Sequence, residues 1–108
     1  MQTIDEFRPF VLRLMQDGQP RKMRQIIEAV CQDAGLSEEE KAERLASGQS
    51  RADNRIGWVC TSFAKAGILE RPGRAIYKIT PAGQAFYKKW GQADKIMEKD
   101  LAGLPLWD

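Results

Sequence analysis

The stretch from residue 51 to residue 66 constrains the fold of this chain more than any other segment. On a helical wheel its apolar side chains fall within about 100° of one another, and polar side chains with one tryptophan cover the opposite side. The apolar set is Ile56, Val59, Cys60 and Phe63, and the opposite set is Arg51, Asn54, Trp58, Thr61, Ser62 and Lys65. The pattern predicts a helix with one buried and one exposed face, closed by Gly67.

A β-hairpin is predicted directly after this helix. Residues 68–71 and 75–79 are two short strand-like runs, and Pro72-Gly73-Arg74 joins them. A Pro-Gly pair between two such runs is typical of a hairpin turn.

The first helix carries two conflicting signals at its start. Thr3-Ile4-Asp5-Glu6 has the form of a capping box, which favours a helix that begins after Thr3. Pro9 lacks an N–H group and crowds the preceding turn, so it favours a later start. We expect the helix to begin near Phe7, with Pro9 in its first turn, and to end at Asp17-Gly18.

The segment between the first helix and the central helix has its own start and stop signals. Residues 21–23 are predicted to form a short strand, and an apolar stripe from Met23 to Ala34 predicts a helix that Gly35 caps. Ser37-Glu38-Glu39-Glu40 is a second capping box and opens a short charged helix to about Leu45. Residues 47–50 are predicted to form a turn.

A last helix is predicted after Thr80, which suits an N-cap, with Pro81 at the first helical position. Its apolar positions at helical spacing are Phe86, Trp90, Ala93 and Met97. We expect this helix to reach about Asp100 and to pack on the first helix. Its far end, together with Leu101, Leu104 and Trp107, offers a contact for a homodimer.

The order of these elements predicts a mainly α-helical fold with a small β-hairpin. It is that of a winged helix-turn-helix with a three-helix core, a wing, an additional short helix and a C-terminal helix. We expect residues 1–108 to form a single domain, with a core over about 5–85 and a C-terminal helix and tail over about 82–108. No apolar run approaches the roughly 18 residues of a membrane span. The polar N-terminus does not resemble a secretory signal, so we expect a cytoplasmic protein with no membrane partner.

The residue types present exclude most common catalytic and metal sites. The chain has no histidine and only two cysteines, Cys31 and Cys60, both on apolar helical stripes. This composition excludes nucleophile pairs and general bases that need histidine, and every tetrahedral zinc site built from His and Cys. We expect no catalytic residue, no metal site, no cofactor and no enzyme activity, and two buried, reduced thiols.

Positive charge is concentrated in the middle of the chain. Residues 49–79 hold six Lys/Arg against two Asp/Glu, residues 1–48 hold seven against nine, and residues 80–108 hold four of each. Nucleic acid is the commonest partner of such a basic block. The charge map therefore favours double-stranded DNA as the partner.

Three motifs in the sequence resemble a known family. They are Asp53-Asn54-Arg55-Ile56-Gly57-Trp58, then Lys65-Ala66-Gly67-Ile68-Leu69, and Ile79-Thr80-Pro81-Ala82-Gly83. Over roughly residues 5–85 the chain resembles the N-terminal winged-helix domain of Mrr-type restriction proteins. The resemblance implies DNA binding by a winged helix. In that family a nuclease domain of the PD-(D/E)xK class, which degrades DNA with methylated bases, often follows.

A nuclease centre is not expected in this chain. Its only Asp/Glu-x-Lys triplet is Glu39-Glu40-Lys41, which lies in the predicted charged helix. A metal-dependent nuclease needs this triplet on a strand beside a second acidic residue. The resemblance therefore carries over DNA binding but not cleavage.

Candidate DNA contacts come from the central helix, the residues before it and the hairpin. A recognition helix in the major groove presents its polar face to base edges, where Arg suits guanine and Asn suits adenine. A wing usually contacts phosphates, and Arg74 at its tip is the foremost candidate for such a contact. The candidates are Gln49, Ser50, Arg51, Asn54, Arg55, Trp58, Ser62, Lys65, Arg71, Arg74 and Lys78.

Several of these residues have a second interpretation. Ser50 suits a plain N-cap, the hairpin cations suit ordinary surface charge, and Arg55 suits either a phosphate or an acidic partner such as Asp53. Trp58 suits packing under the wing, contact with a base or a thymine methyl, or a pocket for a methylated base. Two other functions also use this fold. One is a dimeric transcriptional regulator with a palindromic operator, and the other is a protein-interaction winged helix that binds no DNA.

Overall fold

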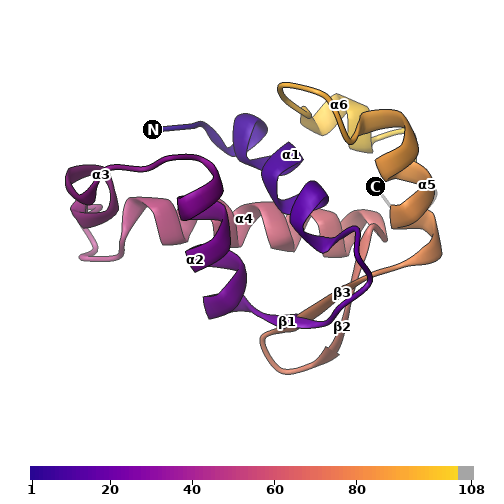
Figure 1. The fold of residues 1–108 in the computed structure, drawn as a ribbon, viewed down its shortest axis with the longest axis horizontal. Helices are drawn as coiled ribbons and strands as arrows, with labels where there is room; N and C mark the ends of the chain where they lie inside the picture. The colour runs from indigo at the N-terminus through magenta and orange to yellow at the C-terminus, as the bar shows by residue number, and fades with distance from the viewer. Residues whose placement is uncertain (105–108) are drawn as a thin grey trace.

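The computed structural model describes residues 1–104, which are mainly helical and include a small antiparallel sheet (Figure 1). The elements are α1 (Ile4–Met15), β1 (Arg21–Lys22), α2 (Met23–Asp33), α3 (Glu38–Ala42), α4 (Arg51–Ala66), β2 (Leu69–Gly73), β3 (Ile76–Ile79), α5 (Pro81–Trp90) and α6 (Glu98–Leu101). Within the described residues the sheet has three strands in the order β1-β3-β2. This arrangement is compatible with a winged helix.

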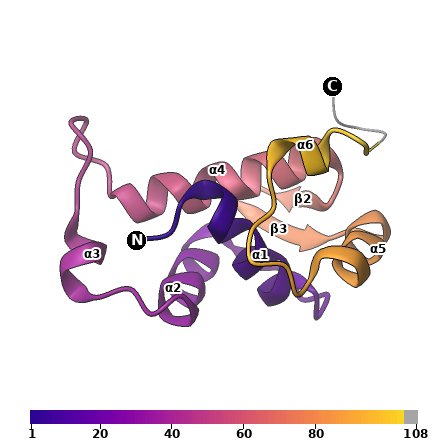
Figure 2. The same cartoon turned by 90° about the horizontal axis from the view of Figure 1, so that it is seen from above.

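The other elements are arranged around α4. Figures 1 and 2 show α1 and α2 alongside it, α3 near one of its ends, and α5 and α6 toward the other. The apolar stripe of α4 is buried as predicted, and it packs with apolar residues of α1 and α2. Fully buried members of this core include Phe7, Val11, Leu12, Ile26, Val30, Ile56, Val59, Cys60 and Phe63.

Both cysteines are buried free thiols, as predicted. Burial raises the pKa of Cys60 to about 12 and also raises the pKa of Cys31. Neither thiol therefore has the lowered pKa that a reactive cysteine needs.

The first helix begins earlier than predicted, because the start near Phe7 is wrong. The helix begins at Ile4, where Thr3 and Glu6 form the reciprocal hydrogen bonds of a capping box. Pro9 lies inside the helix and leaves the carbonyl of Asp5 without its usual helical donor. That carbonyl instead accepts a hydrogen bond from the N–H of Ile96 at 2.9 Å. A contact from the far end of the chain thus replaces the bond that the proline removes.

The charged helix α3 is shorter than predicted, and the expected end near Leu45 is wrong. After Ala42 the chain becomes extended, and Arg44 pairs with Ser50 in an isolated antiparallel bridge. The N–H of Leu45 donates to the carbonyl of Gln49 at 2.8 Å, so this loop uses backbone groups that another helical turn would need. The turn predicted at residues 47–50 lies slightly earlier, at residues 46–48, where the N–H of Gly48 donates to the carbonyl of Leu45 at 2.8 Å.

The hairpin forms as predicted, but its turn lies one residue later. Gly73 belongs to β2 and pairs with β3, so the turn consists of Arg74 and Ala75 rather than Pro72-Gly73-Arg74. The register shifts between Glu70 and Gly73, at the point where Pro72 cannot donate to the ladder. The bulge adds a residue to β2 and moves the turn along the chain.

The single long C-terminal helix predicted from the sequence is wrong. α5 ends at Trp90, and Met97 is the N-cap of the short α6 instead of continuing the α5 stripe. Ile96 and Leu101 are fully buried and belong to the core. Because Leu101 is buried within its own chain, it cannot supply the homodimer contact. Leu104 is partly buried against the core, and Trp107 lies outside the described residues.

The predicted packing of α5 on α1 is confirmed by two hydrogen bonds. Gln84 Nε2 donates to the carbonyl of Gln16 at 2.9 Å, and Arg13 Nη1 donates to the carbonyl of Gly91 at 3.2 Å. None of the helices in residues 1–104 has the length and apolar character that a membrane-spanning segment requires.

Candidate nucleic-acid interface

The exposed face of α4 is formed by residues spaced three or four apart. Asn54, Gly57, Trp58 and Thr61 lie on consecutive turns of this helix, opposite its buried stripe. Trp58 is 56% exposed and is the one large hydrophobic side chain that residues 1–104 leave exposed. Trp58 therefore does not pack beneath the hairpin, which was one of its predicted placements.

A shallow pocket of about 410 Å³, here called the α4 pocket, lies over this face. Its lining includes the four α4 residues above, Gln49 and Asp53 near the start of the helix, and Met23 from α2. The N–H of Met23 donates to the carbonyl of Ala75 in the hairpin turn at 2.8 Å. The hairpin turn therefore lies beside the same part of the molecule as the exposed face of α4.

The hairpin carries its predicted cations on exposed positions. Arg74 lies in the turn, beside Ala75, which has a positive φ of 58°. The Arg71 guanidinium lies over the ring of Tyr77, 5.6 Å from its centroid. Burial raises the pKa of Tyr77, and the charge of Arg71 opposes that shift. Lys78 is directly opposite Glu70 across the β2–β3 ladder, so these two side chains of opposite charge stand on the same face of the sheet.

The candidate residues at the start of α4 form contacts with one another and with neighbouring residues at this helix terminus. Ser50 is the N-cap, and its hydroxyl accepts the N–H of Asp53 at 3.2 Å. Asn54 Nδ2 donates to Gln49 Oε1 at 3.2 Å, and both side chains remain at the surface. Arg51 Nε lies 3.4 Å from Glu43 Oε2, but the alignment does not make a hydrogen bond.

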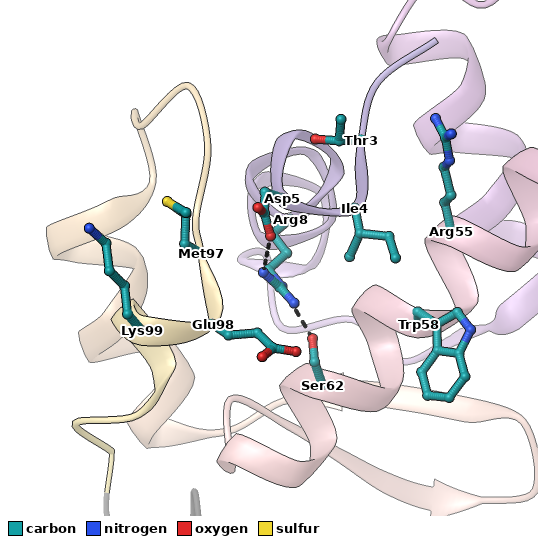
Figure 3. A pocket seen from close by; sticks show the side chains of 10 residues that line it. All are labelled: Thr3, Ile4, Asp5, Arg8, Arg55, Trp58, Ser62, Met97, Glu98 and Lys99. Carbon is teal, nitrogen blue, oxygen red and sulfur yellow. Dashed lines mark hydrogen bonds and ion pairs between the residues drawn. The ribbon is translucent and has the colours of Figure 1, made fainter.

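Two of the predicted α4 contacts, Arg55 and Ser62, lie away from the α4 pocket, whereas Trp58 lines both that pocket and a neighbouring one. Figure 3 shows Arg55 and Ser62 at a second pocket, of about 730 Å³, between α1, α4 and α6. Arg55 Nη1 donates to the carbonyl of Gln2 at 2.6 Å, so its partner within the chain is a backbone carbonyl and not the acidic side chain considered for it. The hydroxyl of Ser62 accepts from Arg8 Nε at 3.3 Å. Lys65 is exposed near the end of α4.

A buried arginine accounts for the position of Ser62. Arg8 is only 3% exposed, and its Nη1 donates to Asp5 Oδ1 at 2.6 Å and to the carbonyl of Ile96 at 2.8 Å. These bonds join α1, α4 and the segment before α6. The sequence offers no signal for them, because Arg8 stands in the apolar part of α1 and its partners lie far along the chain.

The candidates from the sequence omit five residues that line the α4 pocket or lie beside it, namely Met23, Arg24, Asp53, Gly57 and Thr61. Gly57 and Thr61 lie on the exposed face that the helical wheel indicates, so their positions were available from periodicity alone. Met23 and Arg24 open α2, and Arg24 is 65% exposed with its Nη2 3.4 Å from Asp53 Oδ2. Their proximity to α4 depends on how two helices pack, which no local pattern reports.

The acidic triplet is part of a helix cap. Glu40 accepts the N–H of Ser37 at 3.0 Å and lies 2.8 Å from the α-amino group of Met1. The hydrogen bond from that amino group and the one from Ser37 lower the pKa of Glu40 to about 2. In the described part of the chain, no group of three or more His, Cys, Asp or Glu side chains is placed to hold a metal ion.

Comparison with known proteins identifies the family. The family model of the Mrr N-terminal domain matches residues 5–89. The chain belongs to the Mrr N-terminal domain family. The resemblance noted in the sequence is thereby confirmed. The chain is also 33% identical over 82 residues to the type IV methyl-directed restriction enzyme EcoKMrr of Escherichia coli K12.

The match to that enzyme covers 75% of this chain and 27% of the enzyme. The chain thus spans only a minor part of the length of this relative. No solved structure matches the chain.

Proposed function

We propose that this chain is a winged helix-turn-helix domain that binds double-stranded DNA. The observation that carries the proposal is the position of the exposed α4 face beside the hairpin turn, linked through Met23. In a winged helix the recognition helix enters the major groove and the wing contacts the adjacent backbone. Here α4 is the recognition helix and the β2–β3 hairpin is the wing.

The candidate residues divide into two roles. Asn54, Trp58 and Thr61 face outward from the middle of α4 and are proposed to meet base edges. Arg74 and Arg71 of the hairpin and Arg24 of α2 are exposed cations and are proposed to contact phosphates. Arg55 and Ser62 face the other pocket, so we assign them no base contact.

We propose that the domain is a cytoplasmic DNA reader related to restriction systems, with no nuclease centre of its own. Support comes from the family and from the relative, which is described as a methyl-directed restriction enzyme. The absence of histidine and the helical setting of Glu39-Glu40-Lys41 support the second part of the proposal. A dimeric regulator and a protein-interaction module remain the rival functions. A DNA-binding measurement distinguishes the proposal from the protein-interaction module, because that module binds no DNA.

Fluorescence anisotropy with labelled duplexes of about 20 base pairs, roughly two helical turns, tests the proposal. Each phosphate that the protein neutralises adds about −0.9 to the slope of log K against log salt concentration. We expect binding that weakens steeply as salt rises. Failure to bind any duplex at low salt contradicts the proposal and favours the protein-interaction module.

Arg74→Ala is the sharpest single variant for the wing. It should weaken binding several-fold on every duplex sequence and reduce the salt slope by about one, because it removes one phosphate contact. Lys88→Ala is the matched control, since it removes one exposed charge from α5, whose residues do not line the α4 pocket. Equal losses in the two variants, or a loss on one sequence only, would contradict the phosphate role.

A further inference from the structure

The glycine in the middle of α4 has no role in the packing of the chain itself. A Cβ built at Gly57 has nothing within 4 Å, and this residue lies inside a regular helix of 16 residues. By contrast, a Cβ built at Gly83 falls 2.2 Å from the carbonyl oxygen of Ile68, so the fold requires that glycine. Glycine destabilises a helix interior relative to alanine. The open space at Gly57 therefore calls for an explanation outside the chain.

Gly57 leaves a bare stretch of helix backbone at the α4 pocket. The exposed indole of Trp58 stands next to it, and Met23 lines the same pocket from α2. Asn54 and Thr61 bring an amide and a hydroxyl from the turns before and after. The pocket thus combines an apolar surface, polar groups on either side, and room for a ligand to approach the backbone.

The surroundings of the pocket favour a nucleic acid. Lys22 and Arg24 flank Met23 and are both exposed, and Arg74 is exposed in the hairpin turn next to the residue that binds Met23. Asp53 is the acidic group at this pocket, and it lies 3.4 Å from Arg24. Cations therefore border the pocket on the α2 side and the wing side.

We propose that Gly57 is the point of closest approach between this domain and DNA, and that an A·T base pair occupies the α4 pocket. The inference rests on the proposed DNA-binding function and extends it to a specificity-determining residue. The thymine C5-methyl lies against the Gly57 backbone and Trp58, because a methyl group in the major groove needs an apolar partner. Asn54 exchanges its surface bond to Gln49 for a bidentate contact with the adenine.

Gly57→Ala tests the close approach. The added methyl group should raise the melting temperature by several degrees, because alanine is the better helix former and nothing in the chain obstructs it. The same change should weaken duplex binding by about tenfold. Gly103→Ala is the control, since its new Cβ also has nothing within 4 Å but lies beyond α6. Unchanged affinity in Gly57→Ala would overturn the proposal.

Replacement of every thymine by deoxyuridine in an otherwise identical duplex tests the occupant. Removal of one buried methyl group should weaken binding to the unaltered protein by about fourfold. In Gly57→Ala the two duplexes should bind alike, because the methyl contact is already lost. An equal preference for thymine in both proteins would show that the methyl group binds elsewhere.

The outcomes separate this inference from the function on which it rests. Binding of neither duplex by the unaltered protein removes the proposed function. If binding depends on salt but its affinity changes neither in Gly57→Ala nor on loss of the thymine methyl, the proposed function stands and the inference about Gly57 is wrong.

Discussion

At the scale of single residues, two side chains of α1 set the position of the C-terminal segment. Pro9 leaves the carbonyl of Asp5 free to accept the N–H of Ile96, and Arg8 donates to the carbonyl of Ile96. Arg8 is buried while Asp5 is 38% exposed, so removal of Asp5 would leave the buried guanidinium without its carboxylate partner, which is costly. The hydrogen bonds among Arg8, Asp5 and Ile96 therefore hold the N-terminal helix against the C-terminal segment of the described chain.

The ion pair at the end of α1 predicts a pH dependence of stability. The hydrogen bonds from Arg21, and then the N–H of Gln19, lower the pKa of Asp17 from 3.8 to about 2. A lowered pKa stabilises the fold above the unfolded pKa, and this contribution is lost as the pH falls from about 4 to about 2. Because the Asp17 side chain is 41% exposed, screening limits the contribution to about 1 kcal/mol or less.

Asp17→Asn should therefore lower the free energy of unfolding at pH 7 by up to about 1 kcal/mol, and most of that difference should be gone at pH 2, where half of the native carboxyl groups are protonated. Urea denaturation at a series of pH values measures this. Asp94→Asn is the control, because the exposed Asp94 side chain forms no hydrogen bond or ion pair within residues 1–104. A gap between Asp17→Asn and the unaltered protein that persists undiminished at pH 2 would rule out the carboxylate as its source.

At the scale of elements, the sequence predicts what local chemistry determines. The bounds of α4 follow from its apolar stripe, Ser50 and Gly67, and the structure has them as predicted. The predicted start of α1 and the predicted end of α5 are wrong, because contacts with residues far along the chain determine where these helices begin and end. Pro9 is tolerated only with a donor from Ile96, and Arg13 of α1 binds the carbonyl of Gly91 where α5 stops.

Gly83 tests how closely α5 packs on the hairpin. A Cβ at this position lies 2.2 Å from the Ile68 carbonyl oxygen and 2.6 Å from Ile79 Cγ1, so α5 must move to accept it. Gly83→Ala should lower the free energy of unfolding by about 1–3 kcal/mol, despite the better helix propensity of alanine. Chemical denaturation measures the change, and Gly57→Ala serves as a control of opposite sign. A more stable Gly83→Ala protein would mean that the packing is looser than described.

At the scale of the whole molecule, the sequence predicts the exposed face of α4 but not the elements that lie beside it. Periodicity correctly separates the buried and exposed faces of α4, and it finds Asn54 and Trp58. It cannot show that α1 and α6 border one side of that helix, where Arg55 and Ser62 are engaged (Figure 3). It also cannot place Met23 at the α4 pocket, because that position depends on a hydrogen bond to the hairpin turn.

The central claim is that DNA contacts the exposed face of α4 together with the wing. Backbone amide chemical shifts of isotope-labelled protein, recorded during titration with a duplex of about 20 base pairs, test it most directly. The largest shifts should fall on Met23, on residues 54–61 and on the turn at Arg74 and Ala75. Shifts concentrated around Arg8, Arg55 and α6, or no shifts at low salt, would contradict it.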